Sequence, residues 1–202
     1  MLCEVIDVDL APYSGAGSGV PRSSRPGEVH CTDVIRYIEE KLRRGGRGGF
    51  EDMELTMDIG FWWEEMLSRI YMERNIPFPE RPGEFVCDGI VISPDGIGTD
   101  TVEPYPMALR EYKATWQSSR KLPSDNWRYM TQAKSYCYVI GVNVVIYDIA
   151  YLMGNYQGSG PQYRQARVEF TNQELYQNWE MLKLHAKEMM ETKDGRDSNR
   201  EG

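Results

Sequence analysis

The chain has 202 residues, 41% of them apolar or aromatic, which predicts one folded domain with a sizeable core and excludes wholesale disorder. Its four cysteines, at positions 3, 31, 87 and 137, form no CxxC pair, which argues against a disulfide scaffold, a zinc knuckle or a clustered iron–sulfur site. The formal net charge of −8 disfavours a protein that holds nucleic acid by charge alone, whereas an acidic excess suits a site in which carboxylates bind metal.

The ends of the chain and its hydropathy suggest where the protein works. No apolar stretch reaches the roughly 18 residues that a membrane span needs, and Glu4 and Asp7 stand where a secretory signal would carry basic residues. We therefore expect a cytoplasmic protein without a membrane partner. A run rich in Gly, Pro and Ser at 11–28 divides the chain into a flexible N-terminal arm (1–28), a folded domain (29–190) and a disordered tail (191–202).

Hydrophobic periodicity and capping residues predict eight elements in the order α-α-β-β-α-β-β-α. The helices are expected from Thr32 to about 42, from about 60 to 76, at 123–140, and from the capping box at Thr171 to about 190; the strands are expected at 84–92, 107–113, 142–151 and in a partner that ends at Phe170. This order predicts a single α/β domain with a central mixed sheet flanked by helices.

Acidic side chains on the first two expected strands, 84–92 and 107–113, indicate the chemistry of the site. Glu111 and Lys113 are two residues apart on a strand, so their side chains leave the same face of the sheet. Asp88 stands in an apolar run, where a lone buried carboxylate is costly unless it is paired. If the two strands are neighbours, these groups converge, and a divalent cation would relieve the repulsion between the carboxylates.

Two helices can complete this set. Glu64 flanks an apolar stripe and has no cation one helical turn away, whereas its neighbour Glu65 lies four residues before Arg69 and can form an ordinary ion pair. Gln132 and Tyr136 are spaced i,i+4 on the helix expected at 123–140, after the strand that carries Lys113. They therefore share one helix face and can orient the lysine, a water or a phosphate.

Taken in order, Gly60-Phe-Trp-Trp-Glu64, Asp88-Gly89, Glu111-Tyr112-Lys113 and Gln132-Ala-Lys-Ser-Tyr136 form a pattern that resembles the PD-(D/E)XK nuclease superfamily, and its RecB-like branch with the lambda-type phage exonucleases in particular. The resemblance covers roughly residues 30 to 150. It implies a restriction-endonuclease-like fold and a metal-dependent deoxyribonuclease, with exonuclease favoured over endonuclease. If a phage encodes the chain, it works in the host cytoplasm.

The resemblance also implies a role for each matched residue. Glu64, Asp88, Glu111 and the backbone carbonyl of Tyr112 would bind Mg²⁺ or Mn²⁺. Lys113 would position and activate the attacking water, with Gln132 and Tyr136 supporting it. DNA is the implied partner, and the resemblance raises a ring-shaped homo-oligomer and a single-strand annealing or recombination partner. Cys87 departs from the pattern, because it stands where the family has its proline.

Two other functions stay open at this stage. One is a relative that binds DNA without turnover, against which the intact acidic residues and lysine argue. The other is a metal-dependent phosphohydrolase that acts on nucleotides and is indifferent to polymer length. Each motif also has a structural interpretation: an exposed ion pair for Glu111 and Lys113, a turn for Asp88-Gly89, and a plain amphipathic face for Gln132 and Tyr136.

The remaining candidates concern contacts with DNA. We expect Trp116 and Arg120, just beyond the lysine, to meet DNA, while Trp62, Trp63 and Trp127 are expected in the core. Arg22 and Arg25 can grip a 5′ phosphate, and a solvated arm explains them equally well.

Overall fold

The computed structural model describes residues 2–6, 27–42, 53–79, 81–100, 107–158 and 160–197. In chain order the elements are β1 (Leu2–Ile6), β2 (Val29–His30), α1 (Cys31–Leu42), α2 (Met53–Glu73), β3 (Phe85–Cys87), β4 (Ile90–Ile92), β5 (Gly96–Thr99), β6 (Met107–Thr115), the 3₁₀ helix η1 (Pro123–Asp125), α3 (Trp127–Ile140), β7 (Val144–Tyr151), β8 (Gln162–Glu169) and α4 (Asn172–Asp197). Among these helices, none combines the length and the apolarity that crossing a bilayer requires.

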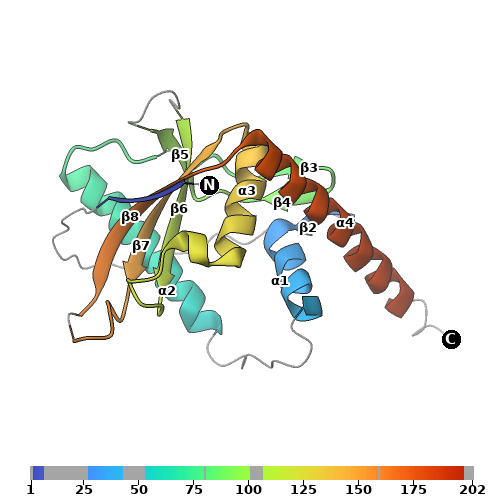
Figure 1. Ribbon diagram of the computed structural model, residues 1–202, viewed down its shortest axis with the longest axis horizontal. Helices are drawn as coiled ribbons and strands as arrows, with labels where there is room; N and C mark the ends of the chain where they lie inside the picture. The colour runs from blue at the N-terminus through green and yellow to red at the C-terminus, as the bar shows by residue number, and fades with distance from the viewer. Residues whose placement is uncertain are drawn as a thin grey trace.

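The strands form two sheets (Figure 1). The larger has the order β1-β8-β7-β6-β5, in which β6 and β7 are parallel and all other neighbours are antiparallel. The smaller has the order β2-β4-β3. The predicted α/β class, with a central mixed sheet flanked by helices, is therefore confirmed.

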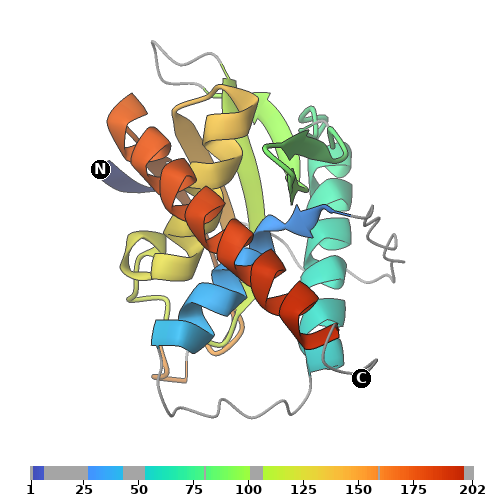
Figure 2. The same ribbon diagram turned by 90° about the vertical axis from the view of Figure 1, so that its right-hand side faces the viewer.

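Alternation along β6 separates the two faces of the larger sheet. Leu109 belongs to the main core together with Met130 and Tyr136 of α3, whereas Tyr112 packs against Trp63 and Leu67 of α2. Helix α3 therefore covers one face and α2 covers the other, and α1 and α4 pack beyond α3 (Figures 1 and 2). The side chains of Glu111 and Lys113 are on the α3 face, because they alternate with Tyr112.

Local signals placed the end of α3 and the start of α4 correctly, but α3 begins at Trp127 and not at 123, where the structure has η1. The side-chain Oδ1 of Asn126 accepts the N–H of Tyr129 at 3.3 Å and caps α3, which ends at Gly141 in the left-handed region. The predicted capping box before α4 is confirmed, because Thr171 N–H donates to Glu174 Oε2 at 2.9 Å and Glu174 N–H donates to Thr171 Oγ1 at 3.2 Å.

The strand expected at 84–92 is wrong in a way that matters for the site. It is two antiparallel strands, β3 and β4, joined by a turn at Asp88-Gly89. Asp88 has φ +51° and Gly89 has φ +74°, and the Asp-Gly pair is typical of such tight hairpins. Asp88 is therefore at a hairpin tip and not in the middle of a buried strand.

Other elements differ in extent from the sequence expectations. Residues 2–6 of the segment predicted as a flexible arm form β1, and α4 continues to Asp197 beyond the end expected near 190. Helix α2 begins at Met53 and not near 60, and β5 was not foreseen. Residues 7–26 of the predicted arm lie outside the described residues.

Only one of the three tryptophans expected in the core is buried. Trp63 is 4% exposed and its indole N–H donates to the backbone carbonyl of Asp148 at 3.0 Å. Trp62 and Trp127 are 48% and 42% exposed, so their placement in the core was wrong. Trp62 points about 100° away from its buried neighbour Trp63 around α2, and Trp127 is the first residue of α3.

The segment that follows α2 crosses closely over β5. A Cβ atom built on Gly98 would lie 3.1 Å from Pro79 Cβ, and one built on Gly96 would lie 3.2 Å from the same atom. Phe78 meanwhile stacks on Tyr112 with ring centroids 5.5 Å apart. This contact ties the end of α2 to the edge of the larger sheet.

Candidate functional site

The candidate site lies where β6 extends past the start of β5. The pairing of β5 with β6 begins at Gly96 opposite Arg110, and Asp95 comes directly before it. Asp95 Oδ2 accepts a hydrogen bond from the backbone N–H of Tyr112 at 2.9 Å, where the backbone carbonyl of a neighbouring strand would otherwise accept it. Because the N–H and C=O of one residue point to the same edge of a strand, the Tyr112 carbonyl faces this edge too.

Lys113 joins two carboxylates at this edge. Its Nζ donates to Glu111 Oε2 at 2.6 Å and to Asp95 Oδ2 at 3.4 Å. The Glu111 side chain is fully buried, and its Oε1 has no hydrogen-bond partner among the described residues. Lys113 and Asp95 are each 16% exposed, so solvent reaches the group from the side of Asp95.

Glu64 reaches the same place from α2. The charges of Asp95 and Lys113 both act on its carboxyl group, and Arg81 Nη2 donates to its Oε2 at 2.7 Å. Glu65, the alternative, is instead paired with Arg69, as its spacing predicted. We call Glu64, Asp95, Glu111 and Lys113 the edge cluster.

The electrostatics of the edge cluster are those of a site with too much negative charge. Burial raises the pKa of Glu111 to about 8; Lys113 opposes this rise, and Asp95 and Glu64 add to it. Burial, together with the charge of Asp95, raises the pKa of Glu64 to about 7, against the effects of Arg81 and Lys113. For Lys113, burial alone would lower the pKa, yet Asp95 and Glu111 raise it well above its usual value, so the amine is charged at neutral pH.

Gln132 and Tyr136 lie next to this cluster on α3. Gln132 Nε2 donates to the Tyr136 hydroxyl at 3.3 Å, which confirms that the two share a helix face. Tyr136 is buried, and burial is the main cause that raises the pKa of its phenol well above the usual value, with the charges of Cys31 and Glu111 adding to it. The phenol is therefore a neutral hydroxyl near the closed end of the cluster.

The structure does not bring Asp88 to the edge cluster. Its Oδ2 accepts the indole N–H of Trp179 at 2.8 Å and lies 3.9 Å from Lys183 Nζ, both on α4, and the side chain is 50% exposed. The expected convergence with Glu111 was wrong, because β3 and β4 belong to the smaller sheet while Glu111 is in the larger one. Asp95, which follows the hairpin, takes the place that Asp88 was expected to fill.

Sequence reasoning thus missed Asp95 and Arg81. Ser93-Pro94-Asp95-Gly96 has the composition of a turn, which hides an acidic residue at the start of a strand. Arg81 follows a proline-rich linker that carries no periodic signal. The strand after Asp95, which would mark its place beside Glu111, has too low a strand propensity to be recognised from sequence.

The residues expected to contact DNA are separate from this cluster. Trp116 is 51% exposed just past the end of β6, its carbonyl accepts the hydroxyl of Tyr156, and Arg120 is exposed in the following turn. Arg22 and Arg25 lie outside the described residues.

The donor set of the edge cluster fits a small divalent cation. Mg²⁺ and Mn²⁺ are bound by carboxylate and carbonyl oxygens. The Oε1 of Glu111 is a carboxylate oxygen that has no hydrogen-bond partner among the described residues, so binding a cation would break no hydrogen bond of this atom. In the described part of the chain, no three His, Cys, Asp or Glu side chains already have the mutual geometry of a metal site. The Lys113 ammonium, bonded to both Glu111 and Asp95, holds the position between them, so binding a cation requires the lysine to move aside.

Comparisons with known proteins give structural likeness alone. No family model and no curated protein matches the sequence. Among solved structures, the protein SSO0001 is 13% identical with a TM-score of 0.48, covering 80% of this chain and 77% of that one. LHK-Exo, an alkaline exonuclease from Laribacter hongkongensis, is 15% identical with a TM-score of 0.44, covering 86% of this chain and 94% of that one. Similarities this weak carry no information about the chemistry of the chain.

Proposed function

We propose that the protein is a metal-dependent nuclease of the PD-(D/E)XK type that hydrolyses phosphodiester bonds in DNA. The observation that carries the proposal is the meeting of Glu64, Asp95, Glu111 and Lys113 at one partly open edge of the sheet. Three carboxylates against one lysine, with pKa values of two of them raised by burial and mutual repulsion, make a site that gains from a cation. A solvated surface ion pair would show neither the burial nor the charge excess.

In this proposal Glu64, Asp95 and Glu111 hold Mg²⁺ or Mn²⁺, with the Tyr112 carbonyl as a further donor. The bound ion would supply a water of lowered pKa and would offset charge on the phosphate. Glu111, which is fully buried, would offer its unpartnered Oε1 as a ligand, and the partly exposed Asp95 would offer a second carboxylate nearer to solvent. Tyr136 and Gln132 close the inner end of the site and limit the entry of bulk water.

Lys113 is assigned the role of a charged donor. Burial would lower the pKa of its amine, but Asp95 and Glu111 raise it well above the usual value, so the amine is protonated at neutral pH while it lies beside these two carboxylates. A protonated amine cannot accept a proton from water, but it can donate hydrogen bonds to the attacking oxygen or to a phosphate oxygen, and it stabilises negative charge that builds up as the bond breaks. Its movement away from Asp95 and Glu111 when a cation binds would free its N–H groups for this role.

A matched pair of substitutions tests the proposal. Asp95→Asn removes one charge of the edge cluster, and Asp88→Asn removes one at the hairpin tip, where an amide oxygen can still accept from Trp179. With Mg²⁺ and linear DNA, Asp95→Asn is expected to lower kcat by about 10²- to 10³-fold or more, in the range of lost electrostatic catalysis, while Asp88→Asn stays within about twofold of wild type. If Asp88→Asn lost activity and Asp95→Asn did not, Asp88 would be the catalytic carboxylate. If the two variants were equally active, the edge cluster would have no role in catalysis.

Substrate length and labelled ends separate the remaining alternatives. A nucleotide phosphohydrolase turns over mononucleotides and is indifferent to polymer length, and a DNA-binding relative without turnover retains DNA without cleaving it. Attack from an end, strand polarity, a ring-shaped oligomer and a recombination partner stay predictions from the sequence. Duplexes labelled at the 5′ or the 3′ end, compared with closed circular DNA, show whether cleavage needs an end and which one.

A further inference from the structure

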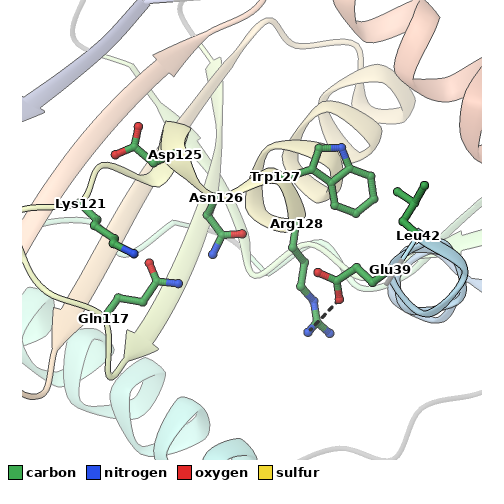
Figure 3. A pocket seen from close by; sticks show the side chains of 8 residues that line it. All are labelled: Glu39, Leu42, Gln117, Lys121, Asp125, Asn126, Trp127 and Arg128. Carbon is green, nitrogen blue, oxygen red and sulfur yellow. Dashed lines mark ion pairs between the residues drawn. The ribbon is translucent and has the colours of Figure 1, made fainter. Parts of the chain in front are cut away.

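A groove with a volume of about 650 Å³ lies where the end of α1 faces the start of α3 (Figure 3). Glu39 and Leu42 line it from α1, Trp127 and Arg128 from α3, and Gln117 and Lys121 from the segment after β6. Gln117 and Lys121 also line a second hollow of about 460 Å³, together with Trp116 and Tyr156. The two hollows therefore adjoin, and we refer to them together as the tryptophan groove.

Aromatic side chains are exposed along the whole of this groove. Trp127 is 42% exposed, Trp116 is 51% exposed and Tyr156 is 58% exposed. Single exposed aromatics are common on protein surfaces, but three on two adjoining hollows form an apolar surface of the kind that marks a binding site. Flat rings on a concave surface are suited to a flat ligand that can stack on them.

The polar groups of the groove suit a phosphodiester chain. In Figure 3, Gln117 and Lys121 direct their polar ends into the groove, whereas the carboxylate of Asp125 points away. Asp125 Oδ2 is engaged by the backbone N–H of Leu122 at 3.0 Å. Lys121 forms no ion pair with any residue that the structure describes, and Arg128 is held loosely by Glu39 at 3.8 Å. In a chain of net charge −8, this is a local surface on which cations are available.

The groove is close to the edge cluster along the chain. Gln117 follows Lys113 by four positions, so the two residues are at most about 13 Å apart. A polymer whose phosphate lay at Lys113 would need to extend no further than this to reach Gln117.

We propose that the tryptophan groove binds unpaired nucleotides of a single DNA strand, stacked on Trp116 and Trp127, with Lys121 and Arg128 on the backbone. This names the substrate class of the site and rests on the proposed function for the link to cleavage. Paired bases offer no free face to a tryptophan, because both faces are stacked inside the duplex, so the exposed rings select unpaired bases. A hollow of this size is in the range of about 300–1,000 Å³ that holds compact ligands, enough for one or two nucleotides.

The test is DNA binding by the full chain in the presence of EDTA, which keeps cleavage out of the measurement. Fluorescence anisotropy of a labelled oligothymidylate is compared with that of a blunt duplex of the same length. Trp127→Ala and Trp116→Ala are each expected to weaken binding of the single strand by about 5- to 150-fold, the usual effect of one lost stacking contact. Binding of the blunt duplex is expected to change less than about twofold, because it gains little from stacking.

Two further variants serve as controls. Trp62→Ala removes a tryptophan of similar exposure, 48%, that lines neither hollow, and it is expected to leave single-strand binding unchanged. Trp127→Phe keeps a ring and is expected to retain most of the affinity. Thermal melting of each variant shows that it is folded before binding is compared.

The results also separate the two proposals from each other. Loss of affinity with Trp62→Ala as large as with Trp127→Ala, an equal loss for the blunt duplex, or no loss at all overturns the groove assignment. Tryptophan-dependent single-strand binding without any cleavage in Mg²⁺ leaves the groove assignment in place and refutes the nuclease. If the protein cleaves DNA in Mg²⁺ but both tryptophan variants keep the single-strand affinity of wild type, the nuclease stands and the groove assignment is refuted.

Discussion

Strand β6 carries a buried charged group on each of its faces, and the two groups have opposite characters. On the α3 side, Glu111 and Lys113 belong to the edge cluster with Glu64 and Asp95. On the α2 side, Asp148 Oδ1 accepts from Tyr163 and from Gln165 at 2.9 Å, and its Oδ2 lies 3.8 Å from Arg110 Nη1. We call this second group the Asp148 network.

The difference between the two groups is one of charge balance and access. Each contains a buried carboxylate oxygen without a hydrogen bond among the described residues, on Glu111 in one case and on Asp148 in the other. In the Asp148 network one carboxylate faces one guanidinium, so the charges cancel, and Trp63 and the rest of α2 cover it. The edge cluster has three carboxylates for Lys113 and the exposed Arg81, and it opens to solvent. Buried charge alone thus does not separate the two groups. The uncompensated excess at an open edge does, and the proposed function rests on it.

The largest contrast is expected when the cation of each group is removed. Lys113→Ala should lower kcat about 10³-fold, because in the proposed reaction it deletes a donor to the phosphate. Its cost in stability should be the smaller of the two, because Glu111, whose pKa is already raised to about 8, can take up a proton when the lysine is gone. Arg110→Ala should instead leave Asp148 buried beside no positive charge and lower the free energy of unfolding by about 3 kcal/mol, with kcat retained below the melting temperature. Nuclease assays and chemical denaturation on both variants check this. If Arg110→Ala abolished turnover without loss of stability, the comparison would be reversed.

Divalent metal should also distinguish the two groups. At a concentration about 100-fold above its Kd, Mn²⁺ should stabilise the folded protein by about 2.7 kcal/mol, which is a rise in Tm of about 5–10 °C for a chain of this length. Glu111→Gln should lose this rise, whereas Asp148→Asn should keep it despite a lower starting Tm. Thermal melts with EDTA and with Mn²⁺ measure the difference. An undiminished rise in Glu111→Gln would place the metal elsewhere.

The pH dependence of stability sharpens the comparison further. Glu111 and Glu64, with pKa values raised in the folded state to about 8 and about 7, contribute most to stability when they are protonated. That contribution is complete below their ordinary pKa values and is lost as the pH rises through 7 and 8. In EDTA, the Tm of Glu111→Gln minus that of wild type should therefore grow between about pH 5 and pH 8. In excess Mn²⁺ the difference should shrink or change sign, since metal favours the ionised form. A constant difference would contradict the raised pKa.

The smallest effect is expected at Arg81. Its guanidinium is exposed and holds Glu64 Oε2, so it competes with a metal ion for that carboxylate. Arg81→Ala should tighten Mn²⁺ binding by about two- to fivefold, the size of an exposed ion pair. Arg69→Ala removes the neighbouring pair with Glu65 and is the matched control, expected to leave metal affinity unchanged. Isothermal titration of both variants provides the measurement, and weaker metal binding in Arg81→Ala would mean that the arginine supports the site.

Sequence spacing predicted those parts of the site that depend on a single element. Glu111 and Lys113 share a face because strands have a period of two, and Gln132 and Tyr136 share one because helices have a period of 3.6. The choice of Glu64 over Glu65 followed from one i,i+4 pair, which the structure confirms. What spacing could not predict is which strand lies beside β6, because that is set by the packing of distant segments. Asp88 was therefore expected beside Glu111, and Asp95, which the structure places there, was not considered.

The same reasoning explains the successes and failures in the fold. The order of the four α-helices and of β6, β7 and β8 was predictable because each has its own apolar pattern or caps, whereas β1, β2 and the division of 84–92 into β3 and β4 were not predicted. Strand β5 was missed because its sequence, Gly96-Ile97-Gly98-Thr99, has two glycines in four residues and low strand propensity. It is a strand because β6 supplies its hydrogen bonds and Pro79 packs on it.

Those two glycines determine how closely the linker after α2 lies on β5. A Cβ atom at either position would come within 3.2 Å of the Pro79 side chain, so only hydrogen atoms fit between the linker and the strand. Asp95 comes directly before this strand, so the same contact helps to hold the stretch that carries its carboxylate. Adding a single methyl group at Gly98 would push the linker and β5 apart by a few tenths of an ångström and should disturb the edge cluster while every acidic residue stayed in place.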